Sequence, residues 1–79
     1  MKLLVRNLSR STTEQEIRTL FSTHGSVTEC DLVLDQKTGK SKGFAFVEMP
    51  NEKEAKSAIA TLHETRVANN RIRVKIAQS

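Results

Sequence analysis

The sequence contains few of the residues that interrupt regular structure or cross-link a chain. Among its 79 residues are three glycines, one proline and one cysteine, Cys30. Because loops depend on glycine and proline, this scarcity predicts a chain that is almost entirely secondary structure. A single cysteine cannot form an internal disulfide, which argues against a disulfide-stabilised secreted domain. We therefore expect a reducing, intracellular location: the cytoplasm, or alternatively the nucleus if the source is a eukaryote.

Long apolar runs are also missing. The sequence has no segment of 18 apolar residues and no N-terminal apolar stretch followed by a small-residue cleavage site. These absences argue against a membrane span and a signal peptide. Because the pattern of elements begins at Met1, we expect residues 1–79 to form a single domain, either a complete small protein or one domain excised from a longer chain.

The length and charge of the chain favour a binding module. A domain near 60 residues buries only about 60% of its unfolded surface, so a chain of this size has a thin core and no room for a deep cleft between lobes. Lys and Arg number 13 against 9 Asp and Glu, giving a net charge of +4 and a pI near 9.6. Basic domains of this kind are typical of nucleic-acid binders, although solubility alone can account for such a charge.

The apolar residues recur with the periods of four strands and two helices. Ile17, Leu20 and Phe21 form one helical stripe, preceded by three overlapping capping boxes in residues 11–16. The stripe of the second helix begins at Ala55, after a cap at Asn51. Alternating residues predict strands over residues 1–6, 26–34, 42–49 and 71–76, with a bulge in the second strand and a left-handed Asn70 before the fourth.

The element order βαββαβ predicts an α+β fold of the ferredoxin-like type. Two helices with apolar stripes can both be buried on one face of a four-stranded antiparallel sheet, which leaves the other face open. The third strand then presents Phe44 and Phe46 on the open face, while Ala45 and Val47 face the helices. Exposed aromatic pairs usually mark a binding surface, or else an interface buried by dimerisation.

Basic residues gather around the two phenylalanines in this arrangement. Aromatic rings among cations suit a single-stranded nucleic acid, because bases stack on rings and phosphates meet cations, whereas a duplex hides its base faces. Eight of the 13 basic residues fall on the predicted open face or in its hairpin loop: Lys2, Arg6, Lys37, Lys40, Lys42, Arg71, Arg73 and Lys75.

Two segments resemble those of a known family. Lys42-Gly43-Phe44-Ala45-Phe46-Val47-Glu48-Met49 is similar to the octapeptide of the RNA recognition motif, and Leu3-Leu4-Val5-Arg6-Asn7-Leu8 resembles its hexapeptide. The resemblance covers essentially the whole chain and implies a single RNA recognition motif domain over residues 1–79. Among members of the family, the chain resembles the short single-domain RNA-binding proteins of bacteria.

The resemblance implies roles for individual residues. Phe46 would stack under a base, Phe44 would insert against the sugars of adjacent nucleotides, and Lys42 would pair with a phosphate. Leu4 stands where the family usually has an aromatic residue, so one of two stacking platforms is missing and weaker binding is expected. Further contacts would come from Lys2, Arg6, Arg71, Arg73 and Lys75 on the sheet, from the main chain near Ala77 and Gln78, and from Lys37 and Lys40 in the hairpin loop.

Three alternatives remain open at this stage. Some members of the family use the sheet or the helices to bind peptides instead of RNA. The loss at Leu4 therefore keeps open a protein-interaction module, in which the sheet or helix face binds a peptide or forms a dimer. Single-stranded DNA is a further alternative, because stacking does not distinguish it from RNA. An enzyme is not expected: His24, His63 and Cys30 lack metal-ligand spacing, no nucleophile–base pair or phosphate loop is present, and no cofactor, metal, membrane or small-molecule substrate is predicted. We expect a monomer, with a dimer not excluded.

Overall fold

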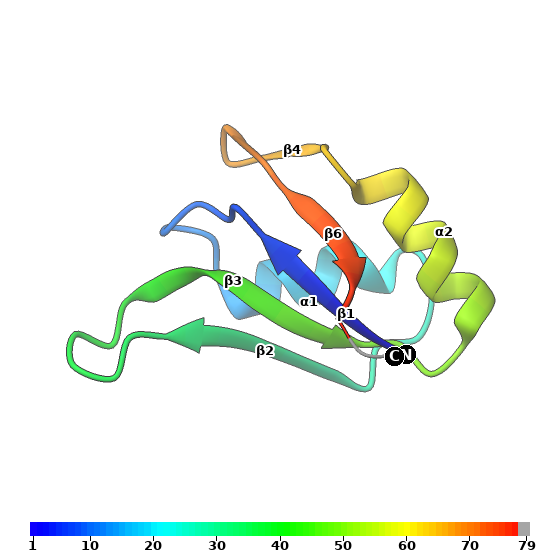
Figure 1. Ribbon diagram of the computed structural model, residues 1–79, viewed down its shortest axis with the longest axis horizontal. Coiled ribbons are helices and arrows are strands. Elements are labelled where there is room, and N and C mark those ends of the chain that lie inside the picture. Colours follow the sequence, from blue (N-terminus) through cyan, green and yellow to red (C-terminus); the bar gives the residue numbers. More distant parts are fainter. Residues whose placement is uncertain (78–79) are drawn as a thin grey trace.

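The computed structural model describes residues 1–77, which form an α+β domain (Figure 1). Its elements follow the order that the sequence predicts, with one additional short hairpin before the last strand. They are β1 (Lys2–Arg6), α1 (Glu14–Ser22), β2 (Glu29–Leu34), β3 (Ser41–Glu48), α2 (Glu52–Leu62), β4 (Arg66–Val67), β5 (Asn70–Arg71) and β6 (Arg73–Ile76).

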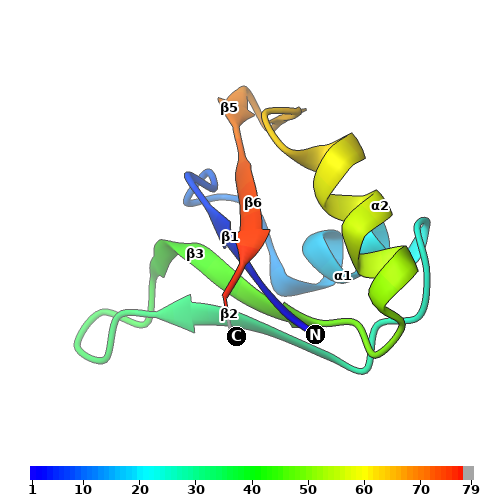
Figure 2. The ribbon, with the colours of Figure 1, turned by 45° about the vertical axis from the view of Figure 1, so that its right-hand side comes forward.

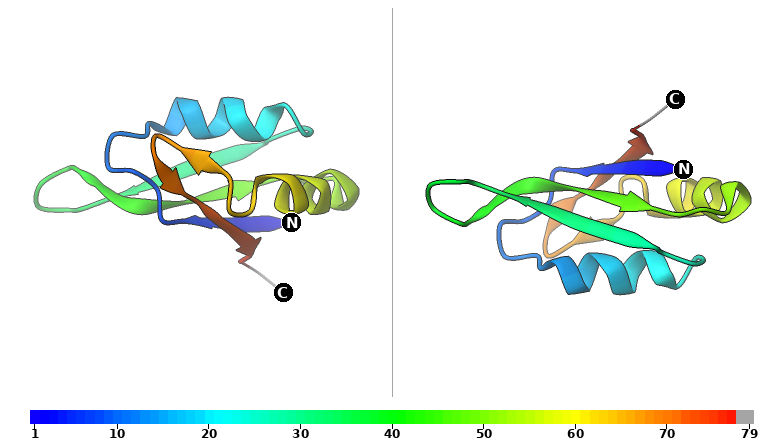
Figure 3. Two further views of the ribbon diagram at one scale, coloured as in Figure 1. Left: turned by 90° about the horizontal axis from the view of Figure 1, so that it is seen from above. Right: turned by 90° about the horizontal axis from the view of Figure 1, so that it is seen from below.

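Four strands form one antiparallel sheet in the order β2-β3-β1-β6. Helix α1 packs against β2 and α2 against β6, and Figure 2 shows both helices on the same side of the sheet. The β2–β3 hairpin extends beyond the helices, as both views of Figure 3 show. The ferredoxin-like arrangement predicted from the element order is therefore confirmed, and one face of the sheet carries no covering element among residues 1–77.

Side-chain caps fix where both helices begin. Thr13 accepts a hydrogen bond from the Glu16 backbone N–H at 3.1 Å, and Glu16 accepts one from the Thr13 N–H at 2.8 Å. This reciprocal pair satisfies two of the N–H groups that a helix start leaves unpaired, and it selects one of the three predicted capping boxes. Asn51 caps α2 by accepting from the Glu54 N–H at 3.0 Å, as predicted.

The core lies between the sheet and the helices. Leu3 and Val5 of β1, and Ala45 and Val47 of β3, are fully buried, which confirms the predicted alternation in both central strands. Phe21 is the one phenylalanine of the three that enters this core. At about 25 cal/mol per Å² of apolar area, these side chains supply the main free energy that holds the two layers together.

The outer strands depart from the prediction at their ends. β2 begins at Glu29 rather than at residue 26, and its register shifts between Leu32 and Leu34, which confirms the predicted bulge. Leu32 and Val27 are only half-buried against the core. In β6, Ile76 lies on the helix side of the sheet opposite Leu3 but keeps 46% of its surface exposed, because it belongs to an edge strand.

The connection predicted over residues 63–70 contains a short hairpin of β4 and β5. Ala68 and Asn69 have φ values of 51° and 70°, so the left-handed backbone lies there and the prediction for Asn70 was wrong. Two left-handed residues between paired strands give the type I′ turn whose twist suits a two-residue hairpin. Strands of two residues are too short to show a period, which is why the sequence pattern missed them.

Candidate nucleic-acid interface

The two phenylalanines of β3 form the centre of the open face. Phe44 and Phe46 are both half-buried, and their ring centroids lie 6.2 Å apart at an interplanar angle of 86°. The pleat of β3 places them two residues apart on one side, as the sequence predicts. Their edge-to-face arrangement leaves the two rings presenting different surfaces to an incoming ligand.

The strand register defines the neighbours of Phe46. Leu4 lies beside it on β1 and Asp31 beside it on β2, while Lys75 on β6 lies beyond Leu4. Directly opposed side chains in such a ladder lie about 5 Å apart, so these groups surround the ring. A flat group stacked on Phe46 would therefore have an apolar side chain and a cation on one side and a carboxylate on the other.

Lys2 lies above the ring of Phe46 in the unliganded domain. Its Nζ atom is 5.8 Å from the ring centroid. An exposed cation–π contact contributes about 0.5–1 kcal/mol, whereas base stacking contributes about 1–3 kcal/mol by truncation. A stacking ligand can therefore displace the Lys2 side chain, whose charge then remains at the rim of the site.

The cations of the open face carry unpaired charge. Arg6 lies opposite Arg73, and Leu4 opposite Lys75, across the β1–β6 ladder. Within residues 1–77, ion pairs are formed by the N-terminal ammonium with Glu48 and by Lys56 with Glu52, and by none of the predicted open-face cations. Adjacent like charges such as Arg6 and Arg73 are unfavourable in the free domain and favour binding of a polyanion.

Acidic side chains also lie on the open face, toward its β2 edge. Glu29 lies opposite Glu48, and Asp31 lies opposite Phe46, so three carboxylates follow the β2 side. Glu48 also accepts an ion-paired hydrogen bond from the Met1 ammonium at 2.7 Å. The positive charge is therefore concentrated over β1, β6 and the start of β3, away from β2.

Of three predicted RNA contacts near the C-terminal end, at Arg71, Ala77 and Gln78, the structure describes the first two. Arg71 lies in β5, outside the four-stranded sheet to which the sequence assigned it, and its carbonyl accepts a hydrogen bond from Asn7 at 2.8 Å. The Ala77 N–H donates to the Lys2 carbonyl at 2.8 Å, which continues the β1–β6 pairing by one residue. Gln78 lies outside the described residues.

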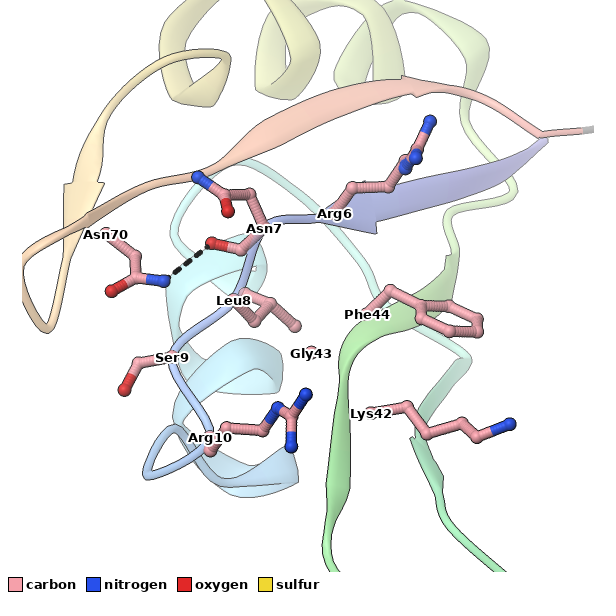
Figure 4. Close-up of a pocket in the computed structure, with 9 residues that line it drawn as sticks. All are labelled: Arg6, Asn7, Leu8, Ser9, Arg10, Lys42, Gly43, Phe44 and Asn70. Carbon is pink, nitrogen blue, oxygen red and sulfur yellow. Dashed lines mark hydrogen bonds between the residues drawn. The ribbon is translucent and has the colours of Figure 1, made fainter.

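A hollow lies beside Phe44 where β1 ends and β3 begins. It has a volume of roughly 600 Å³ and is bordered by Arg6, Arg10 and Lys42 (Figure 4). Sequence reasoning assigned no role to Arg10, because it lies in the loop after β1, where no periodic pattern indicates a direction. The chain is close-packed here: Gly43 has φ of 87°, and a Cβ atom at that position would lie 3.2 Å from the Leu8 carbonyl oxygen.

The hairpin loop between β2 and β3 is organised by one carboxylate. Asp35 accepts hydrogen bonds from the backbone N–H groups of Lys37 at 2.8 Å and Thr38 at 3.0 Å. Both bonds favour the charged form of the carboxylate, the bond from Thr38 most strongly. They therefore lower the pKa of Asp35 below its ordinary value. Lys37 and Lys40 are both exposed in this loop.

Among residues 1–77, no group of three His, Cys, Asp or Glu side chains could hold a metal ion. Burial, followed by the nearby Glu14 charge, raises the pKa of the Cys30 thiol and keeps it protonated. His63 has a structural contact, because its Nδ1 accepts a hydrogen bond from the Val74 N–H at 3.0 Å. Among residues 1–77, no helix is long and apolar enough to cross a membrane.

The family model for the RNA recognition motif matches residues 3–73, almost the whole chain. The chain belongs to the RNA recognition motif family. This finding confirms the resemblance drawn from the octapeptide and hexapeptide segments. Two curated relatives of this RNA recognition motif are named as RNA-binding proteins rather than enzymes, in agreement with the expectation from sequence.

Curated relatives are longer than this chain. The domain is 42% identical over 78 residues to glycine-rich RNA-binding protein 1 of Mycosarcoma maydis, matching 99% of this chain and 45% of that protein. It is 38% identical over 77 residues to the chloroplastic RNA-binding protein CP31B of Arabidopsis thaliana, matching 98% of this chain and 27% of that protein. The chain thus spans less than half the length of these relatives.

Solved structures share the fold closely. RNA-binding protein PG1 superimposes with a TM-score of 0.96 at 34% identity, covering 100% of this chain and 95% of that one. A Sex-lethal protein–RNA complex superimposes with a TM-score of 0.93 at 35% identity, covering 99% of this chain and 47% of that one. RNA complexes are thus present among the structural neighbours of this RNA recognition motif.

Proposed function

We propose that this domain binds single-stranded RNA on the open face of its sheet. Bases and sugars stack on Phe46 and Phe44, and phosphates meet the surrounding lysines and arginines. The observation that carries the proposal is the aromatic pair at the centre of an uncovered sheet face, bordered by cations without ion-pair partners among residues 1–77. Family membership and the Sex-lethal protein–RNA complex among the neighbours support it.

Single strands fit this surface better than duplexes. The rings of Phe44 and Phe46 can be used only by bases whose faces are free, and a duplex stacks those faces internally. The surface is an open sheet rather than an enclosed pocket, which suits a chain of nucleotides better than a small molecule. We propose a monomeric binding unit comprising residues 1–79, acting in the cytoplasm.

The test measures affinity for a randomised pool of short single-stranded RNA at several salt concentrations. Phe46→Ala should lower the affinity by about 1–3 kcal/mol, because the base loses its stacking surface. The wild-type affinity should fall with salt by about 0.7 in the log–log slope for each phosphate neutralised. Chemical-shift changes on adding the RNA should centre on Phe44, Phe46, Arg73 and Lys75.

Leu20→Ala is the matched control, because it truncates a half-buried apolar side chain on the helix side. It should lower stability and leave RNA affinity unchanged. If shifts instead cluster on α1 and α2, or if Phe46→Ala binds as tightly as the wild type, the sheet face is not the RNA site. A pool of single-stranded DNA of the same length tests the choice of nucleic acid, and RNA should bind more tightly.

A further inference from the structure

The loop after β1 brings an additional arginine to the end of the open face. Arg10 borders the hollow beside Phe44, and it also borders a second hollow at the base of the β2–β3 hairpin, next to Lys40. Lys42 and Phe44 border both hollows as well. The two depressions are therefore neighbours that share Arg10, Lys42 and Phe44, and the second lies against the hairpin loop.

Hydrogen bonds on both sides hold this loop in place. The Leu8 N–H donates to the Gly43 carbonyl at 2.8 Å, which ties the loop to β3. On the other side, Asn70 donates through Nδ2 to the Asn7 carbonyl at 3.2 Å (Figure 4). A side chain carried by a loop that is fixed in this way loses less freedom when it binds a ligand.

Arg10 lies close to the backbone of β3 at Gly43. The Arg10 Nε atom is 4.0 Å from the point that a Cβ atom of residue 43 would occupy, and the side chain extends from the loop toward the glycine in Figure 4. A Cβ atom there would be in ordinary van der Waals contact with Arg10. The guanidinium is thus brought between the loop and the strand that carries Phe44.

The charges around Arg10 are those of an anion site. Arg6, Arg10 and Lys42 border the first hollow, no carboxylate borders it, and none of the three cations is ion-paired within residues 1–77. Asp35 borders the second hollow, but its carboxylate already accepts two backbone hydrogen bonds in the hairpin loop. The planar fork of an arginine binds phosphate oxygens through two parallel hydrogen bonds.

We propose that Arg10, together with Lys42, binds a phosphate group of the RNA just beyond the nucleotide that contacts Phe44. This subsite rests on the proposed function of the sheet face and extends it from the sheet onto the loop after β1. The phosphate is either an internal phosphodiester of a strand that continues toward the hairpin loop or a terminal phosphate of a strand that ends there.

Arg10→Gln tests the subsite, and Lys53→Gln is the control because it removes one exposed positive charge from α2. For an octanucleotide, Arg10→Gln should lower affinity on the order of fivefold and reduce the salt slope by about 0.7. Arg10→Lys should recover part of the affinity, because it restores the charge without the planar fork. Thermal unfolding of each variant should match the wild type, since Arg10 is exposed.

Short RNAs distinguish the two sources of phosphate. A trinucleotide without terminal phosphates should bind Arg10→Gln and the wild type equally, because it occupies the rings without reaching the loop. If a 5′- or 3′-phosphate on that trinucleotide raises affinity for the wild type but not for Arg10→Gln, the site binds a terminal phosphate. If terminal phosphates have no effect and Arg10→Gln lowers affinity only for the octanucleotide, the site binds an internal phosphate.

The outcomes separate this subsite from the function on which it rests. The subsite alone would be overturned if Arg10→Gln and Lys53→Gln had the same affinity for every RNA while Phe46→Ala lost binding. A wild-type domain without salt-dependent affinity for any of the RNAs would overturn both.

Discussion

Leu4 limits the stacking capacity of the open face. It is half-buried on β1, between Phe46 on β3 and Lys75 on β6, at the position where an aromatic side chain would add a second platform. An aliphatic side chain can contact a base but lacks the flat π-surface that stacking requires. Under the proposed function, stacking would therefore rest on Phe46 and the rest of the affinity on the cations.

Leu4→Phe should strengthen RNA binding. The added ring lies beside Phe46 on the same face and offers a second base a stacking surface worth on the order of 1 kcal/mol, or about fivefold in affinity. Titration of a short RNA followed by NMR or calorimetry measures the change. Leu4→Ile is the control, because it keeps an aliphatic side chain of the same size. Equal affinities for the two variants would show that residue 4 does not contact a base.

The residues of the site differ in how well sequence alone could find them. Phe44 and Phe46 were predictable because a period of two, read from Ala45 and Val47, fixes which side of β3 faces the helices. Arg10 was not predictable, because the direction of a loop side chain depends on contacts with distant segments. Those contacts are the Leu8–Gly43 and Asn70–Asn7 hydrogen bonds, which join residues far apart in sequence.

Among the structural elements, the β2–β3 hairpin owes its loop conformation to Asp35. Besides the bonds to its carboxylate, its backbone N–H donates to the Lys40 carbonyl at 2.7 Å and its carbonyl accepts from Gly39 at 2.8 Å. Gly39 has φ of 73°, a left-handed conformation that glycine adopts without steric cost. The loop that presents Lys37 and Lys40 is therefore a defined turn.

Asp35→Asn should reveal how the charge of Asp35 contributes to stability. Because the pKa of Asp35 is lowered in the folded state, its stabilising effect is present above the unfolded-state pKa, near 3.9, and is lost as the pH falls through the folded-state value. Denaturant unfolding at a series of pH values should show the wild type more stable than the variant at neutral pH. This difference should shrink as the pH falls below about 4. A difference independent of pH would contradict the role of the charge.

At the scale of the whole molecule, the open face is divided between a basic and an acidic part. Cations lie over β1, β6 and the start of β3, whereas Glu29 and Asp31 lie on β2 and Glu48 lies at the end of β3 opposite Glu29. A polyanion is attracted to the first region and repelled by the second, so the charges favour a path that avoids the β2 edge. The division arises from the sheet order β2-β3-β1-β6. It places β2, which carries Glu29 and Asp31, at the opposite edge from β6, which carries Arg73 and Lys75.

Glu29→Gln should increase RNA affinity. Removing one carboxylate from the acidic edge lowers the repulsion of nearby phosphates, and we expect an effect of about twofold at low salt that fades at high salt. Affinity measured at two ionic strengths tests this. Glu52→Gln, which removes an acid from the start of α2 on the helix side, should change affinity less. A larger effect from Glu52→Gln would place the RNA on the helices.

The sequence by itself determined the order of the two helices and the four main strands, the cap of the second helix, the alternation that builds the core and the aromatic pair of β3. These features are local, because periodicity and capping involve residues within a few positions of one another. Only the tertiary structure decided which distant residues meet: Asp31 beside Phe46 and Arg6 beside Arg73 across the sheet, and Arg10 of the loop close to Gly43. Strand order and the packing of the loop after β1 set these meetings, through hydrogen bonds between segments remote in the chain.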